Sequence, residues 1–101
     1  MTTSVKAASL APIPDPGFLL ADFSTAGTIA DKVGAALPDD VVSVIIQPAG
    51  AALEWRADGT TPTAGNGVYI ADGEMQVWEN QRALIDAAEF LGGSTRIHLF
   101  G

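Results

Sequence analysis

The sequence predicts an all-β protein, a small antiparallel β-sandwich or jelly-roll-like barrel over residues 18–101 with an extended N-terminal arm over residues 1–17. Three observations predict this fold. Short apolar stretches alternate with polar residues at the period of two that half-buried strands show. Turn residues recur about every eight to twelve positions, as they do in small sandwiches. The chain also has 11 glycines and 6 prolines, which suit short strands joined by turns.

Composition limits the classes of protein that fit. The chain of 101 residues is long enough for one domain with one core, and 48% apolar residues against 17% charged indicate a globular protein. A net charge of -7 argues against nucleic acid as a partner, because phosphate binding needs a cationic surface. The same charge argues against docking on an anionic membrane. Cysteine is absent, so we expect neither a disulfide framework nor a thiolate-bound metal.

The predicted arm is defined by three prolines at alternate positions, Pro12, Pro14 and Pro16. Each proline fixes its own backbone angle, removes a hydrogen-bond donor and pushes the preceding residue towards extended geometry. The arm is either a frayed terminus or a stiff strip that lies on a neighbouring subunit. On the second interpretation the three prolines are candidate interface residues, and the arm adds little to the stability of its own domain.

Apolar residues then provide the first anchor into a core, at Phe18 to Leu20 and at Phe23. The next stretch, Thr28 to Leu37, has apolar residues at helical spacing, and Thr28 is a suitable N-cap. Gly34 lowers the helical preference by about 1 kcal/mol relative to alanine. We expect one short helical turn or an irregular crossing here.

From Asp39 onwards the pattern favours strands. The expected strands are Val41–Gln47, Leu53–Ala57, Gly67–Ala71, Met75–Glu79 and Thr95–Phe100. Asp72-Gly73 predicts a two-residue hairpin between the third and fourth of them. Gly92-Gly93 predicts another turn. The segment Arg82–Leu91 is contested, because its alanines favour a helix whereas the flanking strands favour an antiparallel partner; we prefer a strand and keep the helix as the alternative.

The most informative segment runs from Leu53 to Gly67, L-E-W-R-A-D-G-T-T-P-T-A-G-N-G, and combines an alternating strand with a loop of turn residues. One face of the strand carries Leu53, Trp55 and Ala57, and the other carries Glu54, Arg56 and Asp58. The arginine fork can pair with a carboxylate or a loop carbonyl and hold the loop in place. We therefore expect Arg56 and Asp58 to be structural residues at an interface.

The sequence offers little for catalysis. His98 is the single histidine, so a histidine metal site or an acid–base pair of histidines is excluded. Glu54 and Asp58 could in principle act together as in a glycosidase, but two solvated carboxylates beside Arg56 are the simpler interpretation. We expect no enzymatic activity, no cofactor and no metal.

Two aromatic residues, Tyr69 and Trp78, are predicted on the outward face of their strands. Exposed aromatic rings suit stacking on a sugar or burial in a partner protein. Inward packing of Trp78 against a second sheet is the alternative.

The pattern Trp55-Arg56-x-Asp58-Gly59-x-x-Pro62-Thr63 resembles a segment of small β-rich structural proteins in the virions of tailed bacteriophages, over roughly residues 40–101. The chain departs from their usual pattern at Ala57, where a second aspartate is common, and at an inserted Asn66. The resemblance implies a non-enzymatic virion component, assembled in the host cytoplasm and most simply a capsid decoration (cement) protein on the outer head surface. Its implied partners are the major capsid protein and copies of itself.

Two other functions stay open. The first is a tail or head-tail connector component, which belongs to the same structural class. The second is a receptor- or glycan-binding module that uses Tyr69 and Trp78. No nucleic acid or membrane partner is expected for any of the three.

Overall fold

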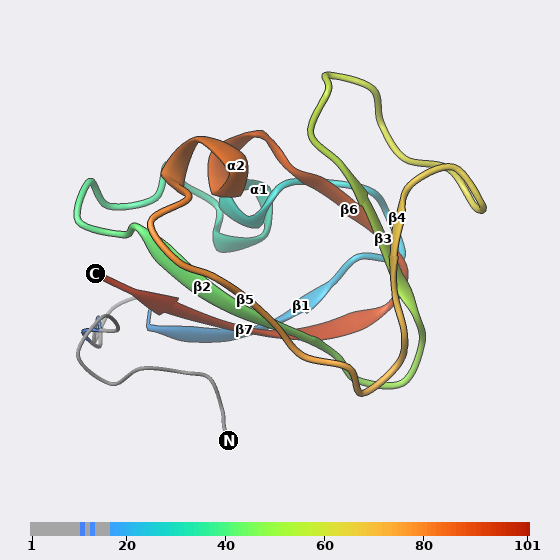
Figure 1. The fold of residues 1–101 in the computed structure, drawn as a ribbon, viewed down its shortest axis with the longest axis horizontal. Helices are drawn as coiled ribbons and strands as arrows, with labels where there is room; N and C mark the ends of the chain where they lie inside the picture. Colours follow the sequence, from blue (N-terminus) through green and yellow to red (C-terminus); the bar gives the residue numbers. More distant parts are fainter. Residues whose placement is uncertain (1–10, 12, 14–16) are drawn as a thin grey trace.

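The computed structural model describes residues 11, 13 and 17–101 of the chain. Within them the chain is mostly β, as predicted, with two short helices between the strands (Figure 1). The order is β1 (Phe18–Asp22), α1 (Ile29–Val33), β2 (Ser43–Pro48), β3 (Leu53–Arg56), β4 (Val68–Ile70), β5 (Gln76–Trp78), α2 (Arg82–Ala87), β6 (Glu89–Leu91) and β7 (Ser94–Phe100).

The strands form two antiparallel sheets. The larger, here called sheet A, has the order β1-β7-β2-β5, and the smaller, sheet B, has the order β4-β3-β6. In sheet A, His98 lies opposite Phe18 on one side and opposite Ile45 on the other. In sheet B, Trp55 lies opposite Phe90. The longest strand, β7, alternates between exposed and buried residues because one of its faces covers the core and the other faces outwards.

Both sheets and both helices contribute to one core. Its fully buried members of largest volume are Phe23, Phe90, Ile29, Ile46, Leu53, Ile70, Ile85, Ile97 and Leu99. Figure 1 shows α1 and α2 side by side above sheet A, with sheet B at the other end. The helices therefore cover the part of sheet A that the shorter sheet B does not reach.

The short helical turn expected after Thr28 is confirmed as α1. Thr28 is the N-cap: its hydroxyl accepts from the backbone N–H of Asp31 at 3.0 Å, and the Asp31 carboxylate accepts from the N–H of Thr28 at 2.9 Å. This reciprocal capping box satisfies two donors at the helix start. Gly34 ends the helix in the left-handed conformation, with φ of 89°.

The strand preferred for Arg82–Leu91 is wrong over its first part, where the chain forms α2, and right over Glu89–Leu91, which is β6. This first part lies between β5 of sheet A and β6 of sheet B, and as a helix it buries Ile85 in the core. Arg82 secures the helix start: its guanidinium donates to the carbonyls of Pro38, Val41 and Leu37 and pairs with Asp86 one turn on.

The hairpin predicted at Asp72-Gly73 is also wrong in its pairing. A tight turn does form there, with the N–H of Glu74 donating to the carbonyl of Ala71 at 3.0 Å. However, it joins β4 of sheet B to β5 of sheet A, and these two strands do not pair. The residues Asp72-Gly73 predict that the chain reverses direction at this point. Which strands then pair depends on which face of each strand the fold buries.

The arm prolines Pro12, Pro14 and Pro16 lie outside the described residues. Two residues of the same segment are described, and both contact the domain itself. Ala11 exchanges two backbone hydrogen bonds with Gly101, at 3.3 and 2.7 Å, and Ile13 is 7% exposed within the core cluster. The expectation that residues 1–17 add little to their own domain is therefore wrong for Ile13, whose burial stabilises the fold.

The turn between β6 and β7 yields a test of the fold. A Cβ added at Gly92 would lie 2.5 Å from the backbone oxygen of Ala52, whereas one at Gly93 would meet the methyl group of Ala51 at 3.3 Å. We expect Gly92→Ala to lower the free energy of unfolding by about 1–3 kcal/mol, because backbone has to move. Gly93→Ala is the matched control and should cost much less. Equal denaturation midpoints for the two variants would contradict this packing.

Candidate interaction sites: the β3–β4 loop and the outer face of sheet A

The loop between β3 and β4, residues 57–67, begins at an ion pair. Arg56 donates from Nε to Oδ1 of Asp58 at 3.1 Å and from Nη2 to Oδ2, a two-point contact that fits the arginine fork. Oδ1 of Asp58 also accepts from the N–H of Thr60 at 3.2 Å. The Arg56 hydrogen bond, followed by the Thr60 one, holds the pKa of Asp58 below its usual value, and the same contact raises the pKa of Arg56. The Arg56–Asp58 ion pair therefore forms at the start of the loop, as the sequence predicts.

Two hydrogen bonds, the burial of Pro62 and a close backbone approach at Gly67 hold the rest of the loop against sheet B. Oε2 of Glu54 accepts from the N–H of Gly65 at 2.9 Å, and the Thr61 hydroxyl donates to Oε1 of Glu89 at 3.0 Å. Pro62 is buried at the middle of the loop. Gly67 closes it, because a Cβ there would lie 3.0 Å from the backbone oxygen of Trp55. Glu54 and Asp58 therefore serve as hydrogen-bond acceptors for the loop backbone.

A hollow of about 500 Å³ lies between this loop and β3. Its lining residues are Trp55, Arg56, Ala57, Asp58, Gly65, Asn66, Gly67 and Val68. The charged groups at its wall are already paired with each other, so they hold the loop rather than present free groups to a ligand. The indole N–H of Trp55 is buried without a hydrogen-bond partner among the described residues, and the ring packs edge-on against Trp78 with centroids 4.9 Å apart.

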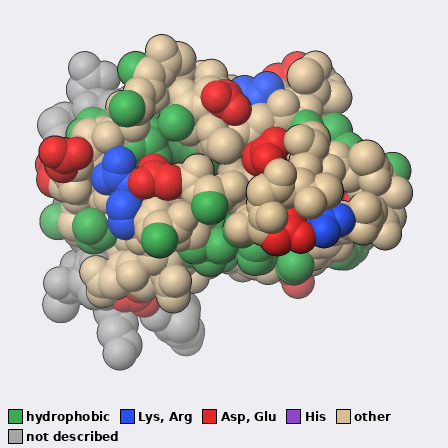
Figure 2. Space-filling view, turned by 90° about the horizontal axis from the view of Figure 1, so that it is seen from above, with side chains coloured by type: hydrophobic (Ala, Val, Ile, Leu, Met, Phe, Trp, Pro, Cys, Tyr) green, Lys and Arg blue, Asp and Glu red, His purple; other side chains and the backbone are tan. Residues whose placement is uncertain are grey.

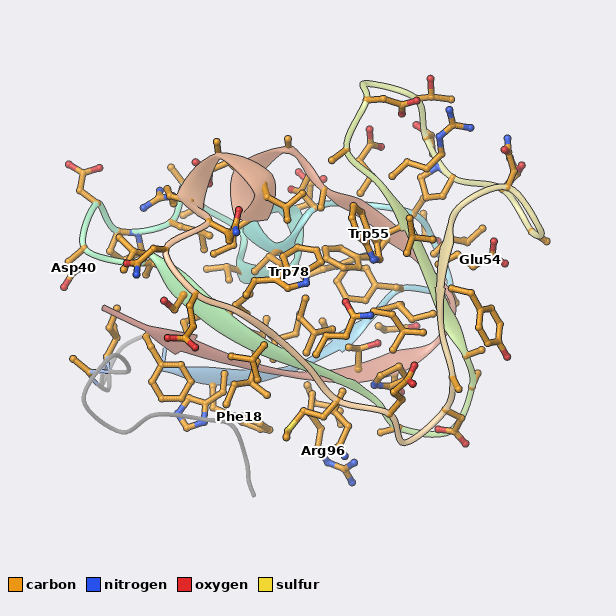
Figure 3. All side chains as sticks on the ribbon, viewed as in Figure 1. Phe18, Asp40, Glu54, Trp55, Trp78 and Arg96 are labelled. Carbon is orange, nitrogen blue, oxygen red and sulfur yellow. The ribbon has the colours of Figure 1, made fainter. Side chains whose placement is uncertain are left out.

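Of the two positions left open for Trp78, outward or packed against the second sheet, the structure has the second. The side chain is 8% exposed and stacks on Phe90 of sheet B, with ring centroids 5.9 Å apart and planes at 25°. Figure 3 shows Trp55 and Trp78 turned towards each other between the sheets. Tyr69 is 63% exposed on β4, as predicted. The two residues therefore do not form one aromatic surface, which removes the pair that the glycan-binding alternative needs.

Sequence reasoning missed a different surface, the outer face of sheet A. Large apolar side chains are exposed there: Phe18 (56%) and Leu20 (62%) on β1 and Met75 (51%) just before β5. Arg96 and His98 of β7 share this face, since they lie opposite Leu20 and Phe18. Figure 3 shows Phe18 and Arg96 projecting from the same side of the sheet. The expected anchor into the core is wrong for Phe18 and Leu20 and right for Phe23, which is fully buried. Three successive apolar residues at 18–20 do not tell which side of the strand faces the core.

The side of the molecule opposite to the outer face of sheet A is acidic (Figure 2). Figure 2 shows acidic side chains spread over the face that carries the helices and the β3–β4 loop, some of them beside a lysine or arginine. Among residues 11, 13 and 17–101, no group of three or more histidine, cysteine or carboxylate side chains could hold a metal ion. In the same residues, neither helix has the length and apolar character that a bilayer-spanning helix needs.

Comparison with known protein families, with curated proteins and with solved structures finds no match for this chain. The resemblance to phage virion proteins therefore stays a prediction that rests on the motif around Trp55. What the chain does has to be argued from its own surfaces.

The Arg56–Asp58 pair predicts a pH dependence. Because the folded state favours the charged form of Asp58, the contribution of the pair to stability is complete above the unfolded-state pKa and is lost as the pH falls through the lowered folded-state pKa. In an NMR pH titration we expect the Asp58 carboxyl to titrate below the usual aspartate range. Arg56→Gln should raise that pKa, and Arg82→Gln should leave it unchanged. An ordinary Asp58 pKa in the unmodified chain would contradict the ion pair.

The two aromatic residues should differ sharply in their contribution to stability. Trp78→Ala removes a buried ring that contacts both Trp55 and Phe90, and we expect a loss of about 3–5 kcal/mol in the free energy of unfolding. Tyr69→Ala removes an exposed ring and should change it by no more than about 0.5 kcal/mol. Chemical denaturation measures both, and comparable losses would contradict the placement of Trp78.

Proposed function

We propose that this chain is a non-enzymatic structural protein of a tailed-phage virion, and specifically a capsid decoration (cement) protein that binds the outer head surface and bridges major capsid subunits. Its fold is then a small sandwich or jelly-roll-like barrel with an N-terminal arm. The protein acts through buried area and shape, without a cofactor and without chemistry of its own.

The outer face of sheet A carries this proposal. Phe18, Leu20 and Met75 are each more than half exposed on one side of a single sheet. Large apolar side chains gathered on one surface are typical of a contact with another protein, because water is displaced from them when a partner binds. The β3–β4 loop supports the proposal in a second way. Its polar groups bind each other, so it is a stiff projection that needs little ordering on contact.

Charge distribution is compatible with this arrangement. The chain has a net charge of -7, and Figure 2 shows acidic groups on the side opposite to sheet A. If sheet A faces the shell, the acidic side faces solvent, where net charge keeps a particle soluble. The arm of residues 1–17 would add contacts to a neighbouring subunit in this assembly. Of this segment, Ala11 and Ile13 lie against the domain that carries them.

A tail or head-tail connector component is the second candidate, and the same apolar face favours it, since a connector also buries protein surface. The glycan-binding alternative has weaker support, because of its two aromatic residues Tyr69 alone is exposed.

The test is binding to undecorated heads of the phage that encodes the chain. We expect saturable binding and new density on the outer head surface in electron micrographs. Replacing Phe18 and Leu20 by serine should abolish binding. Replacing Val68 and Tyr69 by serine is the matched control, because these two residues are similarly exposed, at 49% and 63%, but lie on sheet B. Density on the tail or its connector would favour the second candidate, and absence from purified particles would refute both.

A further inference from the structure

A second hollow, of about 240 Å³, lies on the outer face of sheet A and crosses three strands. Its lining residues are Phe18, Ile45, Gln47, Met75, Arg96 and His98. Apolar side chains form part of the wall, and the polar ends of Gln47, Arg96 and His98 form the rest. The volume is below the range of about 300–1,000 Å³ that holds a drug-sized ligand, so the hollow suits a single large side chain of a partner.

Arg96 has an unusual position for a cation in an acidic chain. Three other cations of the described residues have an acceptor: Lys32 donates to the carbonyl of Thr25, Arg56 pairs with Asp58, and Arg82 pairs with Asp86 and loop carbonyls. Arg96 is exposed and has neither a hydrogen bond nor an ion pair with any described residue. Its neighbours across the sheet are Leu20 and Gln47, which are uncharged.

The groups beside Arg96 are already occupied or apolar. Nε2 of Gln47 donates to the carbonyl of Gly73 at 3.0 Å, which fixes its side chain against the sheet. The His98 ring lies 4.3 Å from the ring of Phe100 and meets Phe18 edge-on at 5.9 Å, measured between centroids. On the same face, the Asp22 carboxylate lies at the end of β1 and accepts from the N–H of Ser24 at 2.9 Å. Among the residues that the structure describes, the hollow therefore combines apolar side chains, an imidazole and a fixed glutamine with a guanidinium that none of them pairs.

We propose that this hollow is a subsite for an acidic segment of a partner protein, which places a carboxylate on Arg96 and an adjacent apolar side chain between Phe18 and Met75. The guanidinium fork matches a carboxylate in two parallel hydrogen bonds, and the apolar wall lowers the local dielectric so that the pair is stronger than in open water. The partner's apolar side chain in the hollow fixes the position of the bound segment. The ion pair between its carboxylate and Arg96 fixes the direction in which the segment runs. This inference rests on the proposed function for the identity of the partner, which would be a capsid subunit.

The charge of the chain selects a protein carboxylate over a nucleic acid. A phosphate backbone presents many charges along its length. A protein of net charge -7, whose described residues place one unpaired guanidinium on this face, repels more of them than it neutralises. A carboxylate beside an apolar side chain presents one charge, which Arg96 meets. The apolar side chain of the segment meets Phe18, Ile45 and Met75 in the rest of the hollow.

A pair of small probes isolates the carboxylate. N-acetylphenylalanine and its primary amide carry the same ring, and only the acid can pair with Arg96. In NMR titrations of the full chain, we expect the acid to shift the signals of Phe18, Ile45 and Arg96 and to bind at least about fivefold more tightly than the amide, a difference within the range of one charge-assisted hydrogen bond. Arg96→Gln should reduce the affinity for the acid to that of the amide. Lys32→Gln, which removes a cation that already donates to the carbonyl of Thr25, is the matched control and should leave both affinities unchanged.

Three results would overturn the subsite: equal affinities for acid and amide, shifts confined to the β3–β4 loop, or no binding of either probe up to its solubility limit. Binding to undecorated heads is measured separately. Heads that bind the chain while the probes fail would refute the subsite and leave the proposed function standing. If the probes bind and undecorated heads do not bind the chain, the subsite stands and the proposed function is refuted.

Discussion

The contact between Trp78 and Phe90 is the interaction on which the rest of the structure depends. Trp78 belongs to sheet A and Phe90 to sheet B, and their rings stack across the gap between the two sheets. Trp55 packs edge-on against Trp78, and Phe23 packs against Phe90 with centroids 5.1 Å apart. Each such pair contributes about 0.5–1.5 kcal/mol beyond the burial of its area. Within the described residues, the two sheets share no strand, so this row of four rings is a main contact between them.

The row of rings also decides which way the neighbouring strands face. Trp55 points inwards, so Glu54 and Arg56 point outwards, because side chains alternate along a strand. Both then reach the β3–β4 loop, where they bind Gly65 and Asp58. The loop is therefore held by residues whose direction follows from a core contact. The same alternation in sheet A buries Ile97 and Leu99 and leaves Arg96 and His98 on the outer face.

The result is a molecule with two unlike sides. The side with the helices and the loop carries acidic groups, some of them already paired with cations. The outer face of sheet A carries exposed apolar side chains and Arg96, which pairs with none of the described residues. A decoration protein needs one side that binds a shell and another that meets solvent, and this asymmetry is the physical basis for the function and the subsite proposed above. The β3–β4 loop is held at both ends, so we expect it to keep the same conformation whether it contacts a partner or solvent.

The sequence by itself determined the local structure. It predicted the alternating strand from Leu53, the Arg56–Asp58 pair, the turn at Gly92-Gly93 and the short helix capped by Thr28, because each depends on residues close together in the chain. Only the tertiary structure decided the strand partners and the direction of Trp78, which depend on residues far apart in the chain. The Asp72-Gly73 turn has the same local chemistry whether or not its strands pair. Residues 82–87 form a helix whose Ile85 is buried in the core and whose Arg82 donates to the carbonyls of Pro38 and Val41. Phe18 is exposed because nothing in the described residues covers β1. Local patterns specify conformation, whereas pairing and exposure follow from which surfaces the whole chain can bury together.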